Sequence, residues 1–72
     1  MKLTEAELHK RFNVVDIQSC PYQQRLLELG IMKGCEVCPL NNLNGTVLVD
    51  IKGCRYAFGE EIAKHINVEE KS

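Results

Sequence analysis

Two glycine turns on either side of a short alternating segment constrain the fold of this chain more than any other feature. Asn44-Gly45 and Lys52-Gly53 flank residues 46–51, where every second side chain is Val or Ile. A dipeptide such as Asn-Gly between two alternating runs indicates a two-residue hairpin loop. The pattern predicts an antiparallel meander of three strands, expected at Cys35–Leu40, Thr46–Ile51 and Cys54–Phe58.

A further strand is predicted earlier in the chain, at Asn13–Gln18. Because side chains alternate across a strand, Val15 and Ile17 should lie on one face and Val14 and Asp16 on the other. This segment supplies a fourth short strand.

The end of the chain adds a helical turn at Glu60–Ile66 and a last strand at Ile66–Val68. The chain has 72 residues, of which 44% are apolar and only 6% aromatic. One domain over residues 1–72, with a small core of Val, Ile and Leu, is the expectation. Five short strands bury their surface most economically by closing into a small barrel.

One short helix is predicted between the first two strands, at Tyr22–Leu29, with Pro21 in its first turn. Its apolar stripe is expected to consist of Tyr22, Leu26 and Leu29, widened by Leu27. Gly30 suits the left-handed position after the helix, and the next residue, Ile31, can fold back onto it.

The amino-terminal segment Thr4–Arg11 contains the capping-box pattern Thr4-x-x-Glu7, which predicts a helical turn. Leu3 and Leu8 could then pack onto the barrel. The segment has neither a hydrophobic run nor a cleavage site, and no apolar run in the chain reaches the length of a membrane span. A cytoplasmic location, with no membrane insertion, is therefore expected.

The charge balance argues against nucleic acid as a partner. Nine basic and ten acidic residues leave a net charge of −1, whereas nucleic-acid binders carry a clustered basic face. The carboxylate pairs Glu60-Glu61 and Glu69-Glu70 are adjacent in sequence, so they do not converge as acid and base. With no triad and no phosphate loop in the sequence, we expect a binding module rather than an enzyme.

Four cysteines, Cys20, Cys35, Cys38 and Cys54, should be thiols in a reducing cytosol. They could hold a tetrahedral zinc or iron ion. However, residues three apart in a strand point to opposite faces. Cys35 and Cys38 are therefore interpreted as small apolar residues, buried or half-buried, rather than as metal ligands. A thioredoxin-like role lacks its helical context.

The two histidines, His9 and His65, lie in predicted helical turns near either end of the chain. Each could ligate a metal, although an isolated surface histidine is more often solvated or caps a carbonyl. No metal site and no cofactor is predicted from them.

Residues 25–37, RLLELGIMKGCEV, resemble the signature of the ferrous iron transport protein A (FeoA) family, a helix ending in Leu-Gly followed by a hydrophobic residue and x-G-x-x-V. The likeness extends from Met1-Lys2-Leu3-Thr4 to Ile66-Asn67-Val68. It implies an SH3-like barrel similar to the carboxy-terminal domain of iron- and manganese-responsive repressors. It also implies a cytosolic accessory of FeoB, the membrane ferrous iron transporter. The four cysteines are not part of that pattern.

An inserted helix and its loop protrude from a barrel, and a loop methionine adapts readily to a partner. We therefore expect the partner surface at Arg25, Glu28, Met32 and Lys33. A transition-metal-binding regulatory module and a small RNA-associated barrel are the alternatives, and exposed strand edges make a homodimer conceivable.

Overall fold

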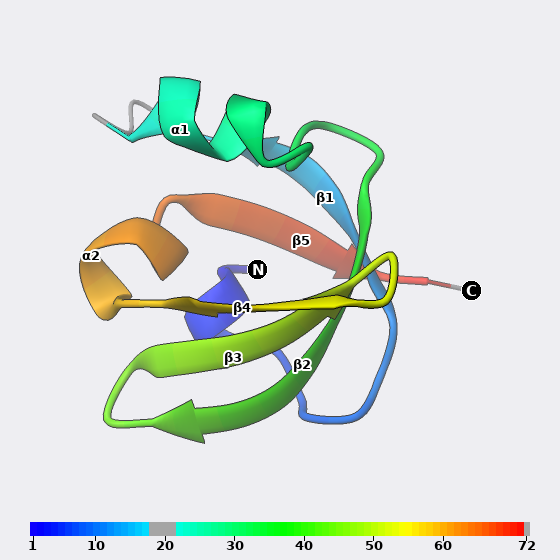
Figure 1. Ribbon diagram of the computed structural model, residues 1–72. Helices are drawn as coiled ribbons and strands as arrows, with labels where there is room; N and C mark the ends of the chain where they lie inside the picture. Colours follow the sequence, from blue (N-terminus) through cyan, green and yellow to red (C-terminus); the bar gives the residue numbers. More distant parts are fainter. Residues whose placement is uncertain (18–21, 72) are drawn as a thin grey trace.

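The computed structural model of the chain describes residues 1–17 and 22–71 and shows one strongly bent five-stranded sheet (Figure 1). All neighbouring strands are antiparallel, in the order β4-β3-β2-β1-β5. The start of β2 pairs with β1 and the rest of it pairs with β3, so this strand joins the two halves of the barrel. The elements are η1 (Leu3–Glu5), β1 (Phe12–Ile17), α1 (Gln23–Glu28), β2 (Glu36–Leu43), β3 (Thr46–Ile51), β4 (Cys54–Phe58), α2 (Glu60–Ala63) and β5 (Ile66–Glu70). The prediction of a small, mainly β barrel is confirmed.

The core is formed by aliphatic side chains from the strands, the helices and the loops between them. Phe12 and Phe58 are its aromatic members. Burial of each large member contributes about 1.5 to 3 kcal/mol before chain entropy is subtracted. Its buried members are Leu3, Ala6, Phe12, Val14, Leu26, Ile31, Cys35, Val37, Val47, Val49, Ile51, Phe58, Ala63, Ile66 and Val68.

Both predicted two-residue turns are present. Asn44 and Gly45 have φ of 55° and 91°, and Lys52 and Gly53 have φ of 54° and 83°. Positive φ at both central residues identifies the turn type that matches the twist of a hairpin. Strands β3 and β4 have the predicted bounds, whereas β2 begins one residue later than predicted and continues to Leu43.

Helix α1 ends as its sequence predicts. Gly30 has a φ of 85° and its N–H donates to the carbonyl of Leu27 at 3.0 Å, while the N–H of Ile31 donates to the carbonyl of Leu26 at 2.9 Å. This pair of bonds closes the helix with Ile31 folded back into the core. Pro21, expected in the first turn, lies outside the described residues.

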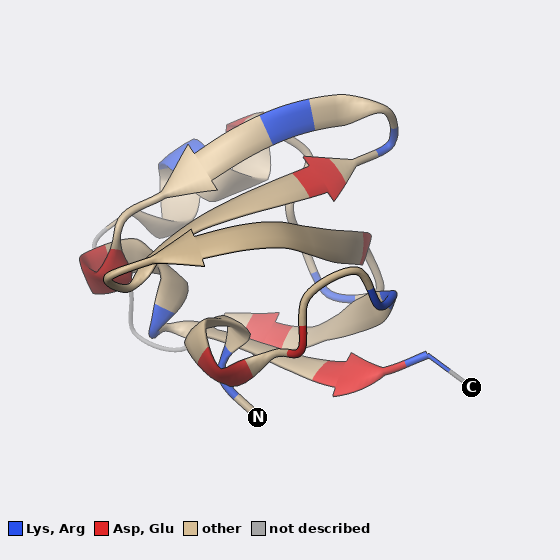
Figure 2. Cartoon of the chain, turned by 90° about the horizontal axis from the view of Figure 1, so that it is seen from below, with Lys and Arg blue, Asp and Glu red and all other residues tan. Residues whose placement is uncertain are grey.

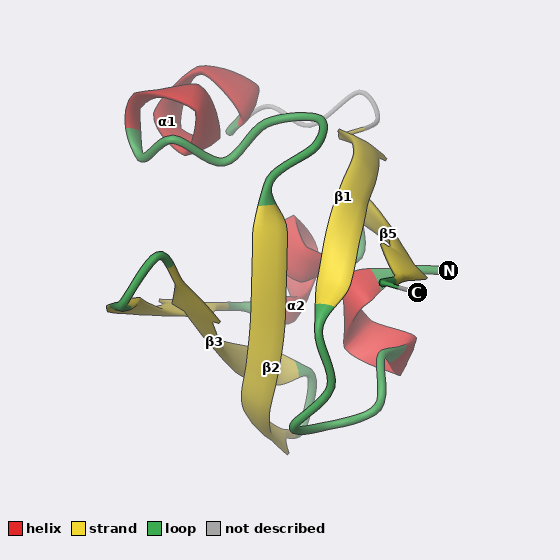
Figure 3. Cartoon of the chain, turned by 90° about the vertical axis from the view of Figure 1, so that its right-hand side faces the viewer, coloured by secondary structure: helices red, strands yellow, loops and turns green. Residues whose placement is uncertain are grey.

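The apolar stripe of α1 is narrower than predicted. Leu26 is buried and Leu29 is half-buried, but Tyr22 and Leu27 keep 42% and 51% of their surface exposed. Figures 1 and 3 both place α1 on the outside of the barrel. A helix of six residues that packs against the outside of a barrel buries only the side chains that point toward the barrel.

The predicted amino-terminal helical turn is wrong in position and type. The chain forms a single 3₁₀ turn at Leu3–Glu5, where the carboxylate of Glu5 accepts a hydrogen bond from the N–H of Lys2 at 3.1 Å. The cap therefore lies two residues earlier than the Thr4-x-x-Glu7 pattern predicted. Leu3 does pack into the core, as expected.

The alternation predicted for the first strand is also wrong. The pairing of β1 with β5 shifts register between Val14 and Asp16, as at a β-bulge. Val14 is buried with Phe12, Val15 is exposed, and Ile17 packs against the core. At the other end of the chain, α2 is shorter than predicted, and β5 runs two residues further than predicted.

The two edges of the sheet differ. The outer edge of β5 is covered by the start of the chain, where the amino group of Met1 donates to the carbonyl of Val68 at 3.1 Å and Val68 N–H donates to the Met1 carbonyl at 2.7 Å. Lys2 forms an isolated bridge with Asn67 beside it. Strand β4, at the other edge, pairs with β3. No helix within residues 1–17 and 22–71 is long and apolar enough to cross a membrane.

Candidate functional site

The surface around α1 is the candidate site, and the structure divides the four predicted contact residues between its two flanks. Met32 and Lys33 line a depression on the β1 side, whereas Arg25 lines a groove on the β4 side. Glu28 is exposed and lines neither of them. Arg25 lies on α1 itself, whereas Met32 and Lys33 follow Gly30 in the loop that leads to β2, so residues close in sequence reach different sides of the helix.

The depression on the β1 side has a volume of about 260 Å³. Buried Ile31 lies beneath it, and the exposed apolar side chains of Leu27 and Met32 border it together with Asp16 and Lys33. Apolar side chains with charges at the rim are typical of a contact surface for another macromolecule. The lining residues are Asp16, Ile17, Gln23, Leu27, Ile31, Met32 and Lys33.

The β4-side groove is larger, at about 350 Å³, and it lies between α1 and the outer strand of the sheet. The rings of Tyr56 and Phe58 stack along one wall, with centroids 6.0 Å apart and planes at 8°. Arg25 contributes the charged group among its lining residues. These are Tyr22, Arg25, Leu26, Leu29, Tyr56, Ala57, Phe58 and Ile62.

The sequence analysis did not assign the β4 residues of this groove to a site. Two aromatic residues at alternate positions of the last meander strand are the signal that could have found them, because they lie on one face of a strand. What the sequence pattern lacked was the position of that strand at an edge beside α1.

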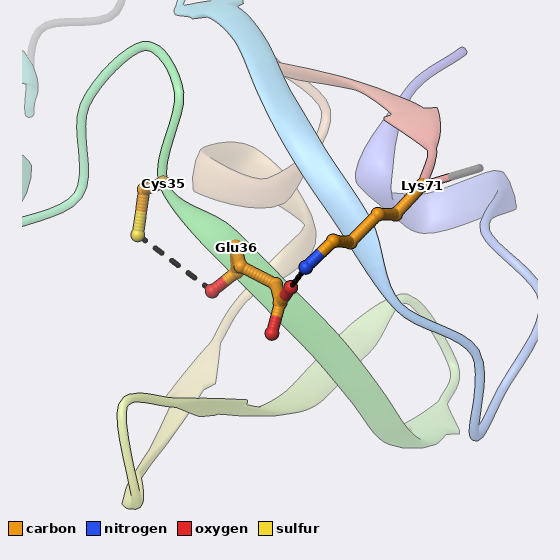
Figure 4. Close-up of polar contacts among 3 residues, drawn as sticks. All are labelled: Cys35, Glu36 and Lys71. Atoms are coloured by element: carbon orange, nitrogen blue, oxygen red, sulfur yellow. Dashed lines mark hydrogen bonds and ion pairs between the residues drawn. The ribbon is translucent and has the colours of Figure 1, made fainter.

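The described cysteines do not converge. Cys35 is buried and its thiol points to the carbonyl of Glu36 at 3.7 Å (Figure 4), while Cys38 is half-buried on the opposite face of β2 and Cys54 is exposed. Cys20 lies outside the described residues. Across residues 1–17 and 22–71, no three His, Cys, Asp or Glu side chains gather as a metal site would require.

The histidines occupy turns. The prediction of a helical turn at His9 is wrong. This residue has a φ of 66°, and its N–H donates to the carbonyl of Pro39 at 2.7 Å. His65 follows α2, and its N–H donates to the carbonyl of Ile62 at 3.0 Å. In both residues it is the backbone that holds the turn.

Charged residues form exposed ion pairs away from α1. Lys71 pairs with Glu36 (Figure 4), and Lys10 lies 3.2 Å from Glu7 and 3.8 Å from Glu70. The hydrogen bond from Lys71 holds the pKa of Glu36 below its ordinary value, and the hydrogen bond to Glu7 raises the pKa of Lys10. Figure 2 shows basic and acidic residues spread over several elements. The three ion pairs therefore lie on the exposed surface of the barrel.

Comparisons with known proteins agree with this architecture. The FeoA domain family matches residues 1–70. A curated relative from Methanocaldococcus jannaschii, named "Putative Fe(2+) transport protein A", is 37% identical over 51 residues. The match covers 71% of this chain and 62% of that protein, so the chain spans less than two thirds of the relative's length.

Solved structures share the fold. FeoA of Stenotrophomonas maltophilia in complex with zinc, described as an SH3 domain protein, is 29% identical with a TM-score of 0.81, over 96% of this chain and 89% of that one. FeoA of Chlorobium tepidum is 24% identical with a TM-score of 0.87, over 100% and 71%. The manganese regulator SloR matches in fold, at 15% identity and a TM-score of 0.85, over 99% of this chain and 34% of that one.

The predicted SH3-like barrel is therefore confirmed, as is the expected likeness in fold to a metal-responsive regulator. Because the family match extends over nearly the whole sequence and solved members have the same architecture, this chain belongs to the FeoA family.

Proposed function

We propose that this chain is a cytosolic accessory protein of ferrous iron uptake, and that it acts by direct contact with a FeoB-type membrane transporter. Membership of the FeoA family supports the iron-transport assignment. The Stenotrophomonas maltophilia relative has been described as a candidate ferrous iron transport activating factor. The role is non-enzymatic, with ferrous iron as the transporter's cargo.

The observation that carries the proposal is the exposed mixture of apolar and charged side chains around α1. Leu27 and Met32 keep 51% and 46% of their surface exposed beside Lys33. Methionine adapts its shape to a partner, and large apolar side chains grouped on a surface mark interaction sites. Arg25, Glu28, Met32 and Lys33 are the proposed contact residues.

Charge reversal tests the contact surface. In a pull-down of the full-length transporter with the tagged protein, Arg25→Glu and Lys33→Glu should each weaken association by about tenfold, which corresponds to ~1.4 kcal/mol. Lys64→Glu is the matched control, because this exposed lysine follows α2 and lines neither flank of α1. If the Arg25 and Lys33 variants both associated with the transporter as wild type does, the contact would lie elsewhere.

A metal titration tests the competing role. If the protein were instead a transition-metal-binding regulatory module, reduced protein would take up ferrous iron or zinc stoichiometrically under anaerobic conditions. We expect no stoichiometric uptake, since the described His, Cys, Asp and Glu residues do not cluster.

A further inference from the structure

The unpaired edge of β4 presents backbone hydrogen-bonding groups to the β4-side groove. Ile51 and Cys54 close the two-residue hairpin and are opposite each other, as are Val49 and Tyr56. Opposed residues of an antiparallel pair alternate between bonded and non-bonded positions. Tyr56 therefore bonds to β3, whereas Arg55 and Ala57 turn their N–H and C=O groups outward.

These outward groups are not taken up by the rest of the described chain. Neither Arg55 nor Ala57 takes part in any backbone hydrogen bond of the turns and loops within residues 1–17 and 22–71. Such a row of unpaired groups is a template for another strand. The edge of β5, by contrast, is already occupied by Met1.

The groove beside this edge has the shape and chemistry to receive side chains of an added strand. Its volume of about 350 Å³ is at the lower end of the range of ligand pockets, roughly 300–1,000 Å³. It therefore has room for one or two apolar side chains. Leu26 of α1 and Leu29, which directly follows the helix, line it together with the stacked rings of Tyr56 and Phe58.

The charge in the groove indicates which kind of strand fits. Arg25 forms no ion pair with any described residue, so a carboxylate on the incoming segment would complete it. A second copy of this chain that paired through the same strand would bring Cys54–Phe58, which carries Arg55 and no acidic residue. The charge pattern therefore favours a different protein over self-association.

We infer that β4 and the β4-side groove bind an extended segment of the partner protein as an added strand. The segment carries an apolar side chain, which lies between Leu26 and Tyr56, and an Asp or Glu that pairs with Arg25. This inference rests on the proposed function, because it names the element by which the transporter is recognised.

Proline at an edge position tests the backbone contact directly. Ala57→Pro removes an outward N–H that does not pair with β3, and proline is tolerated at such edge positions. Ala57→Val is the matched control, since it keeps the N–H. Arg25→Glu and Arg25→Lys form a second pair, which tests the carboxylate. Far-ultraviolet circular dichroism and thermal unfolding verify that each variant is folded.

The probes are the full-length transporter and 15-residue peptides that tile its cytosolic segments. We expect Ala57→Pro and Arg25→Glu to weaken binding at least about tenfold, and Ala57→Val and Arg25→Lys to retain most of it. A saturating peptide should also slow amide exchange at Arg55 and Ala57 in the wild-type protein.

The outcomes separate this inference from the proposed function. Transporter binding that is unchanged in Ala57→Pro would overturn the inference and leave the proposed function standing. An absence of any binding by the wild-type protein would overturn both. Concentration-dependent dimerisation that protects the same two amides without peptide would replace the partner segment by a second copy.

Discussion

The two edges of the sheet differ in whether their outward backbone groups are covered by another part of the chain. The β5 edge is covered by Met1 and Lys2, which pair with Val68 and Asn67. The β4 edge keeps the outward backbone groups of Arg55 and Ala57 beside a groove with an aromatic wall. Exposed edges invite unwanted pairing. The covered edge therefore contributes to stability, whereas the open edge is the one that we propose for binding.

The largest expected effect, on the free energy of unfolding, comes from truncating Leu3. This core side chain holds the start of the chain in place where it covers the β5 edge. Leu3 is 1% exposed and lies directly after the residues that cover β5. Leu3→Ala should lower the free energy of unfolding by about 2 to 5 kcal/mol and accelerate amide exchange at Val68. Urea denaturation and exchange measured by NMR provide the readout.

Leu43→Ala is the control for that variant, because Leu43 is 69% exposed at the end of β2. It should change stability by no more than about 0.5 kcal/mol. Equal losses from the two substitutions would show that the amino-terminal anchor is not part of the folded core.

An intermediate effect is expected at the end of α1, which forms one wall of the groove beside the open edge. Gly30→Ala forces a Cβ into the left-handed region at a φ of 85° and should cost about 1 to 2 kcal/mol. Gly30→Asn should cost less, since asparagine tolerates this conformation. Thermal unfolding distinguishes the two, and an equally stable alanine variant would contradict the helix end described above.

A smaller effect concerns the edges themselves in the free protein. The N–H of Val68 donates to Met1, whereas the N–H of Ala57 has no further strand beside it within residues 1–17 and 22–71. Val68 should therefore exchange its amide hydrogen more slowly than Ala57. Hydrogen–deuterium exchange followed by NMR measures both amides in one sample. Similar rates would remove the contrast between the edges.

The smallest effect is expected where Lys71, just after β5, pairs with Glu36 at the start of β2. Because the pKa of Glu36 is lowered in the folded protein, the pair stabilises the fold above the ordinary carboxyl pKa, and this is lost as pH falls through the lowered value. Lys71→Gln should therefore be slightly less stable than wild type near neutral pH and equally stable in acid.

An NMR titration of Glu36 provides the direct measurement, with its pKa rising toward the ordinary value in Lys71→Gln. Lys64→Gln serves as the control, because it removes a charge outside this ion pair. A Glu36 titration that is the same in all three proteins would show that the ion pair does not form in solution.

Much of the fold was predictable because local chemistry determines it. The two hairpin turns need residues that accept positive φ, and the end of α1 needs Gly30, so both were found from single dipeptides. The bulge between Val14 and Asp16 escaped prediction, since it arises from the pairing of β1 with β5, which lies near the other end of the chain. Non-local pairing also places Met1 on β5, which no local pattern encodes.

The candidate site was predictable only in part. The protruding helix and its exposed residues followed from the pattern of apolar positions, but the separation of Arg25 from Met32 and Lys33 depends on how α1 is oriented on the barrel. The β4 wall was missed because strand order, rather than strand sequence, makes it an edge.

The graded burial of the described cysteines has a practical consequence for spectroscopy. Cys54 is exposed at the start of β4, whereas Cys38 is half-buried and Cys35 is buried. In a Cys20→Ser background, a maleimide dye should react with Cys54 first. The attached fluorophore would then lie on the edge strand β4, so a change in its emission could follow the docking of another polypeptide in real time.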